Sequence, residues 1–294
     1  MGPRHIWVDG RLVAADQAHL SAFDRGFQLG DGAFETLRAR GGNPAEIDRH
    51  LERLRHSTAA LEIHLPEDAA VLIADGIRDL LDAEELSGPD GDAALRITVS
   101  RGAIVGRGLI PADESVPPTI VIQAWPVSPP PAGHLEQGLS LISSSVRRDP
   151  SSPLAALKTT SRVDYVYARL EARHAGADDA LFLTLDGHLS EATTANIFLI
   201  RGDELATPSL ECAILPGTTR DWILGWAPTV GLRATEATLM PRDLASADEA
   251  FLSSSVAGIL PVTAFDGRPI AVGTPGPWTL RARADRDAFI REGG

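Results

Sequence analysis

The sequence predicts a mixed α/β protein built from two domains. Segments in which apolar residues recur at helical spacing alternate with short apolar segments that are typical of strands. A length of 294 residues provides enough chain for two ordinary domains. The segment PVSPPPAG at residues 126–133 has four prolines in eight residues, which neither a helix nor a central strand accommodates. We therefore expect an N-terminal α/β domain at residues 1–125, a linker at 126–134 and a C-terminal α/β domain at 135–294.

The N-terminal half begins with a predicted hairpin at residues 5–13, because Asp9-Gly10 separates two short apolar runs. The glycine-rich stretch at residues 26–32 indicates either a close backbone approach or a plain surface loop. Asp48 is the expected N-cap of the first helix. Apolar spacing predicts strands and helices in this order: strand 34–40, helix 48–62, helix 67–81, strand 95–100 and strand 119–125.

The C-terminal half combines strands with helices around two Asp-Gly turns. The expected elements are strand 139–145, helix 161–174, strand 179–185, strand 195–200, a helix near 215–224, a strand followed by a hydroxyl-rich turn at 250–256, and a hairpin at 266–267. Thr218 or Thr219 marks the start of the helix near residue 215. Because a helix start exposes unpaired backbone N–H groups, this position is a candidate seat for a phosphate group.

Lys158 is the only lysine in the chain. The sequence has 27 lysine and arginine residues together, so that 26 of them are arginine (27 − 1). A guanidinium stays protonated and cannot attack a carbonyl, whereas a desolvated lysine can lose its proton and form a Schiff base. One hypothesis is therefore that Lys158 is kept because the protein needs a primary amine. The alternative is that a GC-rich genome favours arginine codons and one lysine survived by chance.

Three other features accompany this lysine. The helix start at Thr218 could hold a phosphate, and Ser253 to Ser255 form a hydroxyl cluster after an apolar strand. Glu191 places a carboxylate in a Ser-Glu-Ala-Thr-Thr-Ala-Asn turn. A pyridoxal phosphate enzyme needs a lysine for the aldehyde, an arginine and backbone amides for the phosphate, and a carboxylate that keeps the ring nitrogen protonated. The residues therefore favour a pyridoxal 5'-phosphate enzyme.

Bulk composition limits the other classes of function. A net charge of −13 argues against non-specific nucleic-acid binding. No apolar run approaches the roughly 20 residues of a membrane helix, and the first ten residues lack the hydrophobic segment of a signal peptide. Cys212 is the single cysteine, so no internal disulfide can form and a cytoplasmic location is expected. We find no zinc-type Cys/His cluster, and no metal site is expected.

The chain resembles the class IV aminotransferases, which are pyridoxal phosphate enzymes of fold type IV. The strongest resemblance is LSEATTANIF at residues 189–198, which is similar to the family's SExxxxNxF signature, followed by LPGTTR at 215–220. Similar stretches run from about residue 5 to residue 270. The family includes branched-chain aminotransferase, D-amino-acid transaminase, (R)-amine transaminase and aminodeoxychorismate lyase. The resemblance implies two α/β domains with the cofactor in the cleft between them, and a homodimer whose active sites are shared.

The resemblance implies a role for each motif residue. Lys158 would form the Schiff base and carry protons, and Glu191 would pair with the pyridine nitrogen. Arg53, in HLERL, matches the family's phosphate arginine. The remaining phosphate ligands would be Thr218, Thr219 and Ser255, with Ser254 as the alternative to Ser255.

Two arginines are candidates for binding a substrate carboxylate. Arg107 lies in a loop similar to the one from which aminodeoxychorismate lyase binds a carboxylate, and Arg38 is the second candidate. A guanidinium can grip a carboxylate with two parallel hydrogen bonds. Arg162, four residues after the lysine, also has a counterpart in the lyase.

Other positions separate the subgroups of the family. Ser254 stands where the lyase has an asparagine, and Arg107-Gly-Leu109 replaces the Arg-x-His motif of D-amino-acid transaminases. The tyrosine that branched-chain enzymes place five residues after the lysine is Val163 here, so we rank that subgroup last. Tyr165 and Tyr167, which are on the predicted helix 161–174, are expected to pack in the core.

The resulting expectation is a transaminase that moves an amino group from an amino acid, in particular a D-amino acid, or from a primary (R)-amine to a 2-oxo acid. The close alternative is 4-amino-4-deoxychorismate lyase, which forms 4-aminobenzoate and pyruvate on the same scaffold. A non-catalytic protein that binds pyridoxal phosphate is the remote alternative. The expected partners are therefore a small-molecule amino donor, a 2-oxo acid acceptor and a second copy of the chain, without nucleic acid or membrane.

Overall fold

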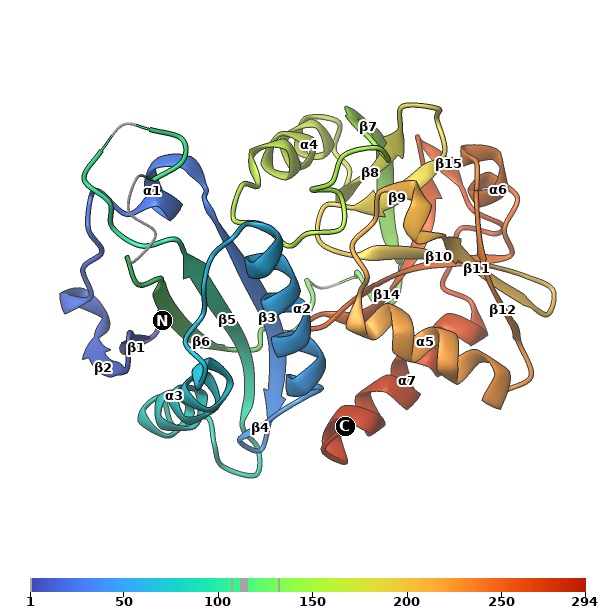
Figure 1. Cartoon of the computed structure of the whole chain (residues 1–294). Helices are drawn as coiled ribbons and strands as arrows, with labels where there is room; N and C mark the ends of the chain where they lie inside the picture. Colours follow the sequence, from blue (N-terminus) through green and yellow to red (C-terminus); the bar gives the residue numbers. More distant parts are fainter. Residues whose placement is uncertain (1, 107, 112–115, 132) are drawn as a thin grey trace. The chain divides into compact units, whose positions relative to one another are not determined.

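A computed structural model describes residues 2–106, 108–111, 116–131 and 133–294 of the chain (Figure 1). The chain forms two compact units, each described here by itself: the first consists of Met1–Ser128, Leu157–Arg162 and Ile290–Gly294, and the second of Pro129–Ala156 and Val163–Phe289. The division after Ser128 falls near the expected linker. Lys158, in contrast, was expected in the C-terminal domain but packs with the first unit.

The first unit contains a six-stranded antiparallel sheet in the order β2-β1-β6-β5-β3-β4. Its strands are β1 His5–Val8, β2 Arg11–Ala14, β3 Gly32–Arg40, β4 Asn43–Pro44, β5 Asp92–Ser100 and β6 Thr119–Pro126. Along β3, Ala33, Glu35, Leu37 and Ala39 share one face, because side chains alternate between the two faces of a strand. The three apolar members of this row are completely or almost completely buried in the hydrophobic core of the unit.

Among its described residues, the first unit has three α-helices: α1 Arg25–Leu29, α2 Ile47–Ala60 and α3 Ala69–Ala83. The helices α2 and α3 supply Leu54, Ile73 and Ile77 to the same core, so both cover one face of the sheet (Figure 1). Gly76 in α3 is required by this packing, because a Cβ at this position would lie 2.6 Å from Cε2 of the buried Trp7 ring.

The second unit contains a nine-stranded mixed sheet in the order β12-β11-β10-β13-β14-β7-β8-β9, with β15 paired to β14. The pairs β11/β12, β14/β7 and β7/β8 are parallel and the others are antiparallel. The strands are β7 Leu139–Arg148, β8 Asp179–Thr184, β9 Leu189–Ala192, β10 Asn196–Arg201, β11 Glu204–Pro208, β12 Arg233–Ala237, β13 Glu249–Ser254, β14 Gly258–Phe265 and β15 Arg268–Pro269.

The helices of the second unit are α4 Val163–His174, α5 Thr218–Thr229, α6 Pro241–Ala245 and α7 Pro277–Arg291. Apolar side chains of α5 and α7, among them Ile223 and Ala282, pack on Phe198 and Phe251 of the sheet. The mixture of helices and strands confirms the predicted α/β class, and most elements lie within a few residues of their expected positions.

One local prediction is wrong. The helix α2 has Glu46 and not Asp48 as its N-cap, because the chain enters the helix through a left-handed residue at Glu46, with φ 51°. Asp48 therefore lies inside the first helical turn, where a carboxylate still interacts favourably with the helix dipole.

Across the described residues, no helix has both the length and the apolar character needed to cross a membrane. Within the same part of the chain, no three His, Cys, Asp or Glu side chains are grouped so that they could hold a metal ion.

Candidate active site

Lys158 is fixed to the open edge of β3 in the first unit. The N–H of Phe34 donates to the carbonyl oxygen of Lys158 at 2.9 Å, and the N–H of Thr160 donates to the carbonyl oxygen of Gly32 at 2.9 Å. The N–H of Lys158 donates to Oγ of Ser57, on α2, at 3.2 Å. A short strand-like segment therefore extends the sheet, which explains why the lysine packs with the first unit and not with the segments that flank it in sequence.

The amine of Lys158 and two guanidinium groups lie close to one aromatic ring, that of Phe34. Lys158 Nζ lies 4.7 Å from the centroid of the Phe34 ring, Cζ of Arg96 lies at 3.9 Å, and Cζ of Arg162 at 5.2 Å. Burial lowers the pKa of Arg96, and the charge of Arg162 lowers it further. Two guanidinium groups that repel each other beside one ring make this position favourable for an anion.

Arg53 projects from α2 into a buried cluster with Glu35 and His50. Arg53 donates from Nε to Glu35 Oε1 and from Nη2 to Glu35 Oε2, each at 2.7 Å. Nδ1 of His50 donates to Glu35 Oε2, also at 2.7 Å. Burial alone would raise the pKa of the Glu35 carboxyl, but hydrogen bonds from Arg53 and His50 and the charges of Arg53 and Lys158 lower it from 4.5 to about 2. Glu35 is therefore a carboxylate at any physiological pH.

The sequence predicted Arg107 and Arg38 as ligands of a substrate carboxylate, and the structure describes only Arg38. Arg107 lies outside the described residues. Arg38 donates from Nε and Nη2 to the two carboxylate oxygens of Asp92, both at 2.6 Å. It lies four residues along β3 from Phe34, a separation of about 13 Å at the usual rise of a strand. This engagement and this distance argue against Arg38 as a ligand of a substrate at Lys158.

Glu191 lies in β9 of the second unit, and its side chain is 6% exposed. Its Oε2 accepts a hydrogen bond from the N–H of Leu215 at 2.8 Å, and its Oε1 accepts one from the Tyr165 hydroxyl at 3.2 Å. Arg148 Nη2 is 3.8 Å from the same Oε1. The Tyr165 ring packs on Phe182 as expected, but its hydroxyl also orients Glu191, a contact that was not predicted from the sequence. Tyr167, which was expected in the core as well, is 56% exposed, so that prediction is wrong.

Hydrogen bonds join the two strongest motifs, SExxxxN at residues 190–196 and LPGTTR at residues 215–220. Glu191 accepts from the N–H of Leu215, and Nδ2 of Asn196 donates to the carbonyl oxygen of Leu215 at 3.1 Å. The next turn needs Gly217, because a Cβ there would collide with Oδ1 of Asn196. The SExxxxN motif therefore holds the backbone that leads into α5.

Hydroxyl groups gather at the start of α5. Thr218 and Thr219 are the first two residues of this helix and are buried. Oγ1 of Thr218 lies 3.2 Å from Oγ of Ser255, while Nη2 of Arg286 donates to Oγ1 of Thr219 at 3.4 Å. Backbone N–H groups at a helix start, together with hydroxyl donors, are a suitable set of phosphate ligands. The Thr218 contact favours Ser255 over Ser254 as a member of this set.

The comparison with known proteins decides the family. The model of the family "Amino-transferase class IV" matches residues 32–265. This chain belongs to the class IV aminotransferases. It is therefore a member of an enzyme family, and the site residues lie in the part that matches, since Lys158, Glu191 and Arg53 all fall within residues 32–265.

Relatives of this class IV aminotransferase carry different activities in their names. A putative branched-chain-amino-acid aminotransferase of Methanocaldococcus jannaschii is 36% identical, over 90% of this chain and 89% of the relative. Aminodeoxychorismate lyase of Bacillus subtilis is 32% identical, over 88% of this chain and 85% of the lyase.

Among solved structures, the branched-chain amino acid aminotransferase of Escherichia coli has a TM-score of 0.91 at 26% identity, covering 99% of this chain and 95% of the other. The similarity confirms that this class IV aminotransferase has the type IV fold that the sequence predicts.

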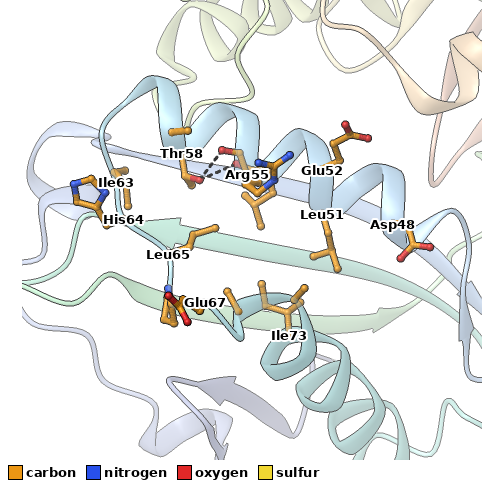
Figure 2. A pocket seen from close by; sticks show the side chains of 15 residues that line it. Asp48, Leu51, Glu52, Arg55, Thr58, Ile63, His64, Leu65, Glu67 and Ile73 are labelled. Atoms are coloured by element: carbon orange, nitrogen blue, oxygen red, sulfur yellow. Dashed lines mark hydrogen bonds between the residues drawn. The ribbon is translucent and has the colours of Figure 1, made fainter.

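A groove of about 630 Å³ lies between α2 and α3 in the first unit (Figure 2). Leu51 of α2 and Ile73 of α3 point toward each other across it, and Arg55 lies at its edge. Arg53 and His50 do not line this groove, because they project from a different face of α2. The groove is therefore separate from the candidate active site, and the exposed Arg55 offers a control position on the same helix.

Glu35, His50 and Arg96 are among the residues of the site that were not predicted from the sequence. A signal was available for two of them: Glu35 interrupts the buried apolar row of β3, and Arg96 interrupts the apolar strand β5. A charged residue inside an apolar strand is rarely buried without a partner. For His50 the sequence offers no comparable signal, since α2 mixes apolar residues such as Leu51 with charged and polar ones.

Proposed function

We propose that this class IV aminotransferase moves an amino group from an amino acid to a 2-oxo acid with pyridoxal 5'-phosphate as cofactor. The observation that supports this reaction most directly is the pair Arg96 and Arg162 beside the Lys158 amine, all on the Phe34 ring. Both substrates of such a transamination carry a carboxylate next to the reacting carbon. A guanidinium is well suited to bind that carboxylate, and a simple amine has no group that would use it.

The residues of the chain fit the cofactor. The buried start of α5, with Thr218, Thr219 and Ser255, would bind the phosphate through N–H and hydroxyl donors, and Arg53 would add a guanidinium. Glu191 would pair with the ring nitrogen, since a buried carboxylate already oriented by two donors favours a protonated partner. When bound, pyridoxal phosphate supplies an aldehyde and a ring that accepts electrons from the substrate carbon.

Lys158 is the proposed catalytic residue. Its amine would hold the cofactor and then, at Nζ, carry the proton from the substrate α-carbon to the cofactor in the first half of the reaction, and carry a proton in the opposite direction in the second half. The backbone bonds to β3 and to Ser57 keep the lysine in place while its side chain moves. Phe34 would exclude water from one side of the amine.

Aminodeoxychorismate lyase activity is the second candidate. Its substrate carries two carboxylates, which suits the paired guanidinium groups of Arg96 and Arg162, and the B. subtilis lyase is 32% identical to this chain. Branched-chain activity, ranked last because Val163 replaces a tyrosine, has to be tested as well, since the M. jannaschii relative runs against that ranking.

We also propose a cytoplasmic homodimer. Phe27, Leu109 and Ile110 in the first unit are 78%, 77% and 76% exposed, which is unusual for large apolar side chains and supports a covered surface. Sedimentation of the purified protein at micromolar concentration tests this, and a monomer would contradict it.

The decisive experiment mixes the cofactor-loaded enzyme separately with D-alanine, L-leucine, (R)-1-phenylethylamine and aminodeoxychorismate. A transaminase bleaches the visible absorbance as the cofactor passes into its amine form, and the productive donor fixes the handedness. Pyruvate release from aminodeoxychorismate without a net change of the cofactor would identify the lyase instead. Protein that stays colourless after cofactor addition would contradict both reactions and favour the non-catalytic alternative.

The carboxylate assignment has its own test. Arg96→Met should raise KM for the productive amino acid roughly 10- to 100-fold, the range expected for a lost hydrogen bond to a charged group. Arg55→Gln, which removes an exposed guanidinium from the groove, should leave KM unchanged. An unchanged KM in Arg96→Met would remove this arginine from the proposed substrate site.

A further inference from the structure

Glu35 and His50 form a fully buried support under the phosphate arginine. Glu35 is 0% exposed and His50 is 1% exposed, so neither side chain reaches solvent. Glu35 comes from β3 and His50 and Arg53 from α2, so the cluster joins a strand to a helix. Burying a carboxylate away from water is unfavourable unless it is paired, and here both oxygens accept hydrogen bonds.

The geometry of the cluster restricts Arg53 more than a single ion pair would. The carboxylate engages Nε and Nη2 of the guanidinium at 2.7 Å each, which fixes the plane of the group and the direction in which Nη1 donates. His50 in turn donates to the same Oε2 that accepts from Nη2, so that the carboxylate cannot rotate without losing a second bond. An unsupported arginine would have to lose considerable side-chain entropy when a phosphate arrives.

The charge of the cluster also indicates that Glu35 acts by fixing the orientation of Arg53. Glu35 stays ionised, as described above, so it cancels the positive charge of Arg53. Attraction by net charge is therefore a small part of what Arg53 can offer to a phosphate. The Arg53 guanidinium, paired with Glu35, can still donate a hydrogen bond in a fixed direction. Such a bond distinguishes a correctly placed phosphate from any other anion.

We propose that Glu35 and His50 are positioning residues that orient Arg53 toward the phosphate of the cofactor. The inference rests on the proposed function, because it assumes that pyridoxal phosphate is the ligand. It assigns to the two residues a share of phosphate recognition and no contact with the substrate.

The test compares two ligands that differ only in the phosphate. Pyridoxal and pyridoxal 5'-phosphate are titrated separately into cofactor-free protein. The dissociation constant of pyridoxal divided by that of pyridoxal 5'-phosphate is the ratio that measures what the phosphate contributes to binding. A general loss of folding stability weakens the binding of both ligands alike and leaves this ratio unchanged. Glu35→Gln should lower the ratio at least about tenfold, since one charge-assisted bond to Arg53 is lost and the amide N–H₂ then faces a guanidinium donor.

Three other variants complete the design. Arg53→Met should lower the ratio as much as or more than Glu35→Gln, and combining the two should bring little further loss, because they act on one interaction. His50→Leu should give a smaller decrease of the same kind, and it keeps the test open if Glu35→Gln does not fold. Arg55→Gln removes a positive charge from the opposite face of α2 and should leave the ratio at its wild-type value.

The outcomes separate the inference from the function on which it rests. An unchanged or increased ratio in both Glu35→Gln and His50→Leu overturns the positioning role, and an increase would show that Glu35 acts only by cancelling charge. A wild-type protein that binds both ligands equally would instead contradict the proposed cofactor.

Discussion

Glu35→Gln should change how the stability of the protein depends on pH. The unfolded chain takes up a proton at Glu35 near pH 4.5, whereas the folded protein keeps this carboxyl ionised until the pH approaches about 2. The ion pair therefore stabilises the folded state fully above pH 4.5, and this contribution is lost as the pH falls toward 2. Glutamine cannot ionise, so the variant lacks this part of the pH dependence.

The size of the effect follows from the two pKa values. A decrease from 4.5 to about 2 corresponds to about 3 kcal/mol of folding free energy at neutral pH. At pH 3 only about 1 kcal/mol of this remains, because the unfolded chain is then mostly protonated and pH 3 lies only about one pH unit above the pKa of Glu35 in the folded protein. Between pH 7 and pH 3 the wild type should therefore lose about 2 kcal/mol more than the variant.

Urea unfolding at pH 7, 5, 4 and 3, followed by far-ultraviolet circular dichroism, measures this difference. Glu52→Gln is the matched control, because it removes an exposed carboxylate from α2 that has no ion pair within the described part of the chain. Its stability should fall with pH in parallel with the wild type. If Glu35→Gln also runs parallel to the wild type, Glu35 is not held as a carboxylate by Arg53 and His50, and the reasoning fails.

Three other predictions concern the proposed catalytic machinery. Lys158→Ala should abolish the visible absorbance of the bound cofactor and turnover together, and retained turnover in the steady-state assay would defeat the mechanism. Gly217→Ala should weaken binding of pyridoxal phosphate about tenfold in a fluorescence titration, since its Cβ would collide with Asn196 and displace the start of α5; unchanged binding would show that the turn tolerates a side chain. Tyr165→Phe should lower kcat about fivefold with little change in KM, because Glu191 loses one hydrogen bond worth about 1 kcal/mol; equal kcat values would show that this bond is not used.

The sequence was informative where a pattern is local. Apolar spacing placed α2, α3 and the long strands, because each buries one regular face. It missed α7, whose sequence PWTLRARADRDAFIR is rich in charges and buries Arg286 among aromatic rings. A helix that buries a guanidinium shows no clean apolar stripe.

The candidate site was predictable only as far as motifs reach. The motif residues Lys158, Glu191 and Arg53 could be proposed as site residues because their neighbours in sequence mark them, and the family itself was confirmed. The Glu35, His50 and Arg53 cluster depends on how α2 lies over β3, which no spacing within either segment specifies. The position of Lys158 with the first unit likewise depends on pairing across more than 120 residues of chain (158 − 34 = 124).

The same pairing makes the first unit discontinuous in sequence. It needs residues 157–162 to complete the edge of β3, and residues 290–294 supply the carbonyl oxygen of Gly294 that accepts from the N–H of Glu46 at 3.0 Å. On a ribosome, the N-terminal unit therefore cannot finish folding first, although N-terminal domains ordinarily do. The edge of β3 stays open until residues 157–162 have been made, and the bond from Glu46 forms only once residues 290–294 have followed, so no single cut releases the unit as an independent module.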